Sequence, residues 1–289
     1  MLKPQYIAVP LFALLIAIEA WLIIRGNRDD FDRKDTWTNI ALGFGSLGFG
    51  LLFGLFHAVA YIGLYELSPL KMPMGAWWAW ALLVVGDDFF YYWFHRFSHE
   101  SRFLWNFHVV HHSSNKFNLS VAVRQSWFGG LAFWVFYLPL ALFGFPYWAY
   151  ALVHGLNLLY QFWIHTELID RLPKPVEFIF NTPSHHRVHH GVNNPYLDKN
   201  YAGIFIIWDR MFGTFVEETE RVRYGIIKPI HSYNWLWINL HAWFEMFEAM
   251  KTKRTLFGKL RCIFASPDMD FEEKTKLKLE PGKFNKIGN

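Results

Sequence analysis

The spacing of histidine residues is the first sign of chemistry in this chain. Of 14 histidines, most fall into four groups: one HxxxH pattern, two HxxHH patterns and one histidine at the end of an apolar segment. On a helix, residues three and four apart project from one face, so each pattern presents its imidazoles together. The candidate metal ligands are His95, His99, His108, His111, His112, His165, His186, His189 and His190.

So many imidazoles predict more than one metal ion. Neutral imidazole suits zinc, iron, copper or nickel, and a structural zinc site is complete with four ligands. The candidates exceed that number and indicate two ions close together. The single cysteine, Cys262, allows no disulfide within the chain and leaves nitrogen and oxygen as the donors. The isolated histidines are interpreted as hydrogen-bonded core residues: His57, His154, His231 and His241.

The stretch SHHRVHH predicts a short helix over about 183–190. Thr182 is a suitable N-cap, and Gly191 after the last histidine is a stop signal. The helix would present three of its histidines on one edge. The fourth, His185, lies one turn below His189, and three roles stay open for it: a tenth ligand, a partner of a ligand, or neither.

The composition predicts a membrane protein. The chain of 289 residues is 53% hydrophobic and 18% charged, whereas soluble domains carry about 25% charged residues. A net charge of +4 suits an anionic lipid surface. The sequence has no basic stripe of the kind that would indicate nucleic-acid binding. Expected spans are 5–24, 38–65, 75–94, 127–148 and 149–165, the last two as a helical hairpin around the turn at 144–146. The expected fold is an all-α polytopic membrane helical bundle of four to five spans with a histidine-rich di-metal cap, a single domain over 1–289.

The charges of the loops predict the orientation of these spans. The 25–36 and 95–126 loops each carry four Lys or Arg residues, and such loops face the cytoplasm. Five spans with the N-terminus outside satisfy both loops. We therefore expect an integral protein of a bacterial inner membrane or the endoplasmic reticulum, with the metal site on the cytoplasmic side.

The C-terminal region differs from the spans. Residues 231–262 combine aromatic residues with a following basic cluster, which is typical of a helix that lies in the membrane interface. A helix packed on the histidine-rich region is an equally good interpretation. Residues 266–289 form a polar tail.

The sequence GFGSLGFG contains a Gly-x-Gly-x-x-Gly pattern at Gly43, Gly45 and Gly48. A dinucleotide site would need a strand before this pattern and a helix start after it, whereas here it lies inside an apolar span. We therefore expect these glycines to allow the close approach of helices.

Four longer segments resemble the fatty acid hydroxylase/sterol desaturase superfamily. They are DFFYYWFHRFSHE (88–100), LWNFHVVHHSSNKFNLSVAVRQS (104–126), LYQFWIHTE (159–167) and NTPSHHRVHHGVNNPYLDKNYAGIFIIWDRMFGTF (181–215), within a core of roughly 75–218. The resemblance implies a membrane non-haem di-iron enzyme that uses O2, with the nine histidines as ligands. Some relatives have a further histidine where this chain has Gln161. Nine ligands with a water or an amide would still serve two ions.

The resemblance also implies an activity. The chain is most similar to members that hydroxylate and cleave alkylglycerol ether lipids, and a sterol, carotenoid or fatty-acyl hydroxylase or desaturase is the alternative. A metal transporter is less favoured, because transporter sites lie near the bilayer midplane. The implied reductant is tetrahydrobiopterin, and other members of the superfamily use cytochrome b5 or ferredoxin partners. The chain itself shows no haem-binding segment and no flavin motif.

Several polar residues are candidates for orienting ligands or contacting substrate. Asp88 lies seven residues before His95, on the same helix face, where a carboxylate would orient an imidazole. A carboxylate inside a span is also costly and often functional. Loop capping and ion pairing are the alternative roles of the remaining candidates, which are Glu100, Arg124, Asp198, Asn200 and Asp209.

Overall fold

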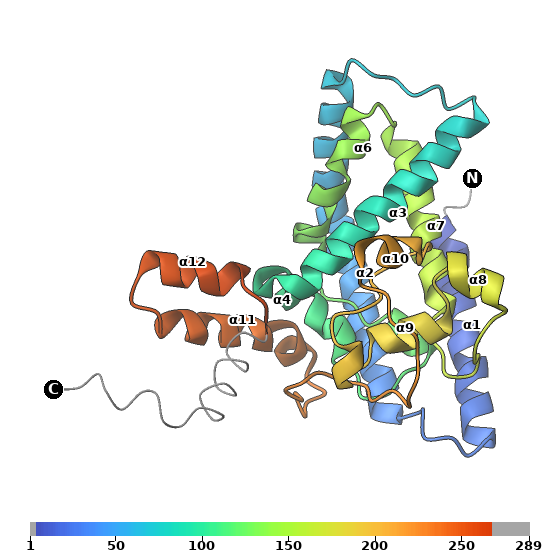
Figure 1. Cartoon of the computed structure of the whole chain (residues 1–289), viewed down its shortest axis with the longest axis vertical. Coiled ribbons are helices and arrows are strands. Elements are labelled where there is room, and N and C mark those ends of the chain that lie inside the picture. Colours follow the sequence, from blue (N-terminus) through green and yellow to red (C-terminus); the bar gives the residue numbers. More distant parts are fainter. Residues whose placement is uncertain (1–3, 268–289) are drawn as a thin grey trace.

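The computed structural model describes residues 4–267, and every regular element in that range is a helix, which confirms the all-α prediction. Helices α1 (Pro4–Arg25) and α2 (Arg33–Leu67) run along the long axis, and α3 (Trp77–Glu100) crosses the view obliquely (Figure 1). Several helices are shorter, and α4 (Arg102–His112) follows directly on the C-terminal end of α3 (Figure 1). Others are α8 (Lys174–Ile179), α9 (Pro183–His189) and α10 (Ile207–Phe212).

Helix α2 is the element most suited to a bilayer. The side chain of Asp32 caps its first turn by accepting a hydrogen bond from the Asp35 amide at 2.7 Å. Its outward residues include the exposed Leu51 and Leu55. Among the described residues, α2 is the one helix long and apolar enough to cross a membrane. Helices also form at the other expected places except 127–148, while the number of spans and the side of the membrane stay predictions.

The prediction of one continuous helix over 127–148 is wrong. This segment forms two short 3-10 helices, η1 (Gly129–Leu131) and η2 (Phe133–Tyr137), followed by α6 (Leu138–Leu142). The paired glycines at the start of the segment weaken a helix there. Pro139 lacks the amide hydrogen that would continue η2, so η2 ends and α6 begins at Leu138 with the proline in its first turn.

The expected turn at 144–146 is confirmed. Gly144 has a φ of 87°, and a Cβ at this position would lie 2.5 Å from the Leu70 carbonyl oxygen. Only glycine fits both conditions. Pro146 then begins α7 (Tyr147–Trp163), which packs against α3 and ends just before His165.

The C-terminal region is a pair of helices, so the expectation of one helix over 231–262 is corrected. Helix α11 (Trp235–Lys251) ends in a polar stretch, and Thr255 caps α12 (Leu256–Phe264) by accepting a hydrogen bond from the Gly258 amide. One face of α11 packs against α4 through residues that include Met246, as the packing interpretation expected. Another face leaves Phe244 and Phe247 exposed. The pair projects sideways from the bundle (Figure 1).

Close packing explains two of the three motif glycines. A Cβ on Gly43 would lie 2.6 Å from the Val123 carbonyl oxygen, and one on Gly45 would overlap the Trp127 indole. Gly48 faces open space. The glycines at positions 43 and 45 therefore let the segment around residues 123–127 lie directly on α2.

Candidate metal centre

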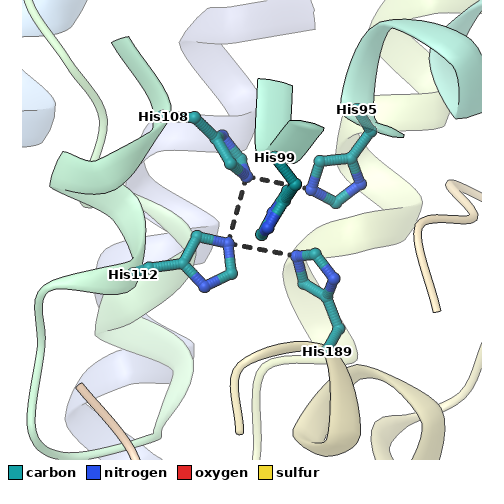
Figure 2. A group of neighbouring side chains, drawn as sticks. All are labelled: His95, His99, His108, His112 and His189. Atoms are coloured by element: carbon teal, nitrogen blue, oxygen red, sulfur yellow. Dashed lines mark hydrogen bonds between the residues drawn. The ribbon is translucent and has the colours of Figure 1, made fainter. Parts of the chain in front are cut away.

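The structure brings the nine predicted histidines together as two buried groups. The ligand atoms within each group all lie within 4.8 Å of one another. The five-histidine group consists of His95, His99, His108, His112 and His189 (Figure 2). The four-histidine group consists of His111, His165, His186 and His190.

Two short helices contribute to both groups, so the groups lie side by side. On α4, His112 belongs to the five-histidine group and its neighbour His111 to the other. At α9, His189 and His190 divide in the same way. The rings of His112 and His190 stack across the boundary, with centroids 4.3 Å apart. This arrangement fits two metal ions close together.

The hydrogen bonds of the four-histidine group call for a cation. The Nδ1 of His111 lies 3.1 Å from the Arg124 carbonyl oxygen, and the Nδ1 of His165 lies 2.7 Å from that of Gln161. A carbonyl only accepts, so each Nδ1 carries the proton and each Nε2 a lone pair. These two Nε2 atoms are 3.2 Å apart. Two lone pairs at that distance repel unless a metal ion or an added proton lies between them, and burial disfavours the added proton.

Burial keeps the imidazoles in the form that binds metal. Burial lowers the pKa of His111 to about 4 and the pKa values of His186 and His189 well below their usual range. The Nε2 atoms of His99 and His190 are buried without a hydrogen-bond partner. Neutral nitrogen donors aimed at a shared centre fit iron, zinc, copper or nickel.

His185 belongs to neither group. Its Nε2 lies 2.9 Å from Glu177 Oε2 on α8, and its ring contacts Phe215. Burial alone would raise the pKa of Glu177, but hydrogen bonds led by those from His185 and the Leu172 amide lower it to about 2. Thr182 precedes α9 as expected, yet its hydroxyl donates to Glu177 rather than capping the helix. His185 therefore connects α9 to α8.

The side chain of Gln161 contacts Asn157. Its carboxamide nitrogen donates a hydrogen bond to Asn157 Oδ1 at 2.8 Å, and Asn157 donates in turn to Asp88. The main-chain oxygen of Gln161, rather than its side chain, holds His165. The role of Gln161 as a substitute ligand through its carboxamide oxygen stays a prediction.

Asp88 contacts the loop that follows Tyr201, whereas direct contact with an imidazole was expected. It accepts hydrogen bonds from the amides of Ile204 and Phe205 at 2.6 and 2.9 Å and from the Trp208 indole. The preceding Tyr201 carbonyl accepts from His95 Nδ1 at 2.8 Å. Asp88 thus holds residues 204 and 205, three and four residues after the carbonyl that accepts from His95.

The remaining candidates are the exposed Glu100, the partly exposed Asp198 and three buried residues near the histidines, Arg124, Asn200 and Asp209. Glu100 forms a surface ion pair with Arg96 and contacts no histidine through its side chain. The guanidinium of Arg124 binds the Val110 carbonyl at 2.7 Å, and its own carbonyl holds His111. Asp198, Asn200 and Asp209 lie on or hold the loop that contacts the five-histidine group.

A cavity of about 120 Å³ leads to the five-histidine group. His99, His112 and His189 form part of its wall. Apolar and charged residues both line the cavity. The apolar ones include Trp105, Val109 and Met246, and the charged ones include Asp198, Lys228 and Glu245. The cavity thus suits a molecule with both an apolar and a polar part.

All nine histidines lie in the region that matches a known family. Residues 80–214 match the model of the fatty acid hydroxylase family. This part of the chain is similar to the fatty acid hydroxylase family. The resemblance seen in the sequence motifs is thereby confirmed.

Curated relatives extend the similarity over most of the chain. Alkylglycerol monooxygenase of Homo sapiens is 42% identical over 270 residues, covering 91% of this chain and 60% of the relative. The same enzyme of Danio rerio is 47% identical, covering 80% and 52%. Ornithine lipid hydroxylase of Rhizobium tropici is 29% identical, covering 51% and 44%. The chain thus spans about half to three fifths of the length of the alkylglycerol monooxygenases. No solved structure matches the chain.

Proposed function

We propose that the chain is an O2-dependent di-iron monooxygenase that hydroxylates a C–H bond of a membrane lipid. The observation that carries this proposal is the pair of histidine groups inside the fatty acid hydroxylase region. Each group would hold one ion, and the bound ions would activate O2 for insertion of one oxygen atom into a C–H bond. We further propose that the apolar helices place the protein in a membrane, with this centre on the cytoplasmic side.

The residues of the chain prepare the site for this chemistry. The neutral imidazoles offer lone pairs without first losing protons. Main-chain carbonyls hold Nδ1 of His95, His111, His165 and His189, so their Nε2 atoms face the metals. Burial of both groups limits the access of water, which would otherwise compete with the lipid.

An ether lipid is the proposed substrate, because two of the relatives above are alkylglycerol monooxygenases. Hydroxylation of the carbon next to the ether oxygen gives a hemiacetal, which collapses to a fatty aldehyde and glycerol. One oxygen atom of O2 enters the lipid and the other leaves as water, so two electrons and two protons must be supplied. Tetrahydrobiopterin is the proposed source, and a cytochrome b5 or ferredoxin partner is the alternative.

The mixed lining of the cavity supports this substrate class. The carbon attacked in an ether lipid lies where the alkyl chain meets the polar head. The cavity offers Val109 and Met246 to the former and Asp198 and Lys228 to the latter. A second candidate is hydroxylation of a different polar lipid, which the similarity to ornithine lipid hydroxylase favours.

Product analysis tests the proposal. Membranes containing the full chain, given alkylglycerol, tetrahydrobiopterin and O2, are expected to form fatty aldehyde. His189→Ala removes a ligand of the five-histidine group and is expected to lower the rate at least a hundredfold, about the loss that follows removal of a group acting directly in catalysis. His231→Asn, at an exposed histidine outside both groups, serves as the matched control.

The outcome also separates the substrate from the reaction class. Aldehyde formed equally by His189→Ala membranes would contradict the role of the histidine groups. Absence of aldehyde with every ether lipid, together with a new hydroxylated lipid that requires His189, would replace the substrate and retain the monooxygenase. Absence of any O2-dependent lipid product would contradict both.

A further inference from the structure

The loop of residues 197–202 contacts three histidines of the five-histidine group. Asp198 Oδ1 lies 3.3 Å from His99 Nδ1. The Lys199 carbonyl accepts from His189 Nδ1 at 3.0 Å, and the Tyr201 carbonyl accepts from His95 Nδ1 at 2.8 Å. All three contacts are made to the ring nitrogen that does not face the centre of the group (Figure 2).

The four-histidine group is held differently. His111 and His165 direct their Nδ1 atoms to the carbonyls of Arg124 and Gln161. These acceptors lie far from the 197–202 loop in the sequence and on other elements. The loop therefore orients one of the two groups. Its aromatic residue adds to this selectivity, because the Tyr201 ring packs against the same three imidazoles with centroids 5.3–6.1 Å away.

The backbone of the loop has an unusual conformation that aims these acceptors. Asp198 and Asn200 have φ values of 56° and 57°, in the left-handed region that most residues avoid. Asparagine and aspartate tolerate this region better than other side chains. Two such residues on either side of Lys199 reverse the chain direction within a few residues. In this conformation the carbonyls of Lys199 and Tyr201, two residues apart, both contact histidines.

Asn200 fixes this conformation to the rest of the molecule. Its side chain is completely buried and binds both the carbonyl and the amide of Val216, at 2.8 and 2.9 Å. The same carboxamide donates to the His185 carbonyl on α9 at 3.2 Å. Asp209 secures the next residues by accepting from the amides of Tyr201 and Ala202 at 2.8 and 2.9 Å. None of these polar groups touches an imidazole ring nitrogen itself.

We propose that Asn200 is a positioning residue that holds the 197–202 loop against His95, His99 and His189. It thereby raises the affinity of the five-histidine group for its metal ion and leaves that of the four-histidine group unchanged. The inference rests on the proposed function, since it takes the two groups to be metal sites. Loss of a group that orients a metal-bound histidine commonly weakens metal binding ten- to a hundredfold. The expected signature is one weakened ion beside one unchanged ion.

The test measures metal binding rather than turnover. The full chain in detergent is stripped with a chelator and titrated with Co²⁺, with bound metal and the visible spectrum recorded. Asn200→Gly retains the left-handed backbone but removes the carboxamide. It is expected to bind one Co²⁺ like the wild type and the second ten- to a hundredfold more weakly. The spectrum of the remaining ion should be that of the four-nitrogen site.

Two further variants keep the result interpretable. Asn193→Gly removes a similarly buried carboxamide that bonds to residues 220–223 and holds no acceptor of a histidine. It is expected to bind both ions normally. Asp198→Gly removes only the contact to His99, and because this side chain is 44% exposed the fold should survive. It is expected to weaken the same single ion, even if Asn200→Gly fails to fold.

Unchanged binding of both ions by Asn200→Gly or by Asp198→Gly would overturn the inference. Equal weakening of both ions, or the same effect in Asn193→Gly, would also overturn it, because either would indicate a general loosening. Failure of the proposed function has a different signature: the wild type would bind two ions, with the selective effect of Asn200→Gly, and still form no lipid product.

Discussion

Main-chain oxygens bind the Nδ1 atoms of the clustered histidines more often than side-chain oxygens do. The acceptors for His95, His111, His165 and His189 are all carbonyls, and only His99 uses a carboxylate. A carbonyl cannot be removed by substitution at its own residue. The residues that matter for orientation are therefore those that hold the carbonyl in place, such as Arg124, whose guanidinium binds the end of α4.

Adjacent histidines on α9 are expected to respond differently to substitution. His186→Ala removes a member of the four-histidine group and should leave the protein with one tightly bound ion. His185→Ala should retain both ions but remove one of the three hydrogen bonds that the half-buried Glu177 carboxylate accepts, which destabilises the fold by about 1.5–3 kcal/mol, the usual contribution of a hydrogen bond to a charged group. Iron content per chain and the thermal midpoint, measured on the same preparations, separate the two effects. Loss of iron in His185→Ala would show that its place outside both groups is wrong.

Histidine spacing predicted eight of the nine clustered histidines, because the HxxxH and HxxHH patterns place their imidazoles on one helix face. His165 was predicted instead from its place at the end of an apolar segment. The acceptors behind them were not predictable from sequence. Lys199 and Tyr201 contribute carbonyls whose position depends on a left-handed turn and on distant Asp209. Trp105, which packs on His99 and His112, was also missed, since one tryptophan among 15 carries no signal.

Helices whose formation depends on a long apolar run, such as α2 and α3, were predictable from the sequence. Elements whose form depends on tertiary packing were not predictable. The 127–148 segment is apolar enough for a span, but its glycines and Pro139 break it into short helices. The segment before it is pressed against α2, and Arg124 there supplies the acceptor of His111. Packing of this element therefore affects the metal centre.

Two glycines on α2 provide a matched test of that packing. Gly45→Ala would force the Trp127 indole to move and is expected to destabilise the protein by about 1–3 kcal/mol. Gly48→Ala meets no atom within 4 Å and should be neutral or stabilise by up to about 1 kcal/mol, because alanine favours the helix. Thermal midpoints in the same detergent compare them. Equal midpoints for the two variants would argue against close packing at position 45.

The whole molecule is expected to depend on its metal for stability. In the absence of a cation, the lone pairs of His111 and His165 face each other at 3.2 Å in a buried site. Binding at a free metal concentration of 100 times Kd would stabilise the fold by about 2.7 kcal/mol. Chelation should therefore lower the thermal midpoint, and Fe²⁺ should restore it. A midpoint that does not respond to either treatment would contradict two filled sites.

The division of neighbouring residues between the two groups has a consequence for how the pattern can vary. His111 and His112 serve different groups, as do His189 and His190. The separation of the two histidine groups is thus set by the backbones of α4 and α9. One residue inserted between His108 and His111 would rotate the rest of α4 by about 100°. That single event would remove histidines from both groups, so we expect the motif to tolerate exchange of its neighbours far better than any change in its length.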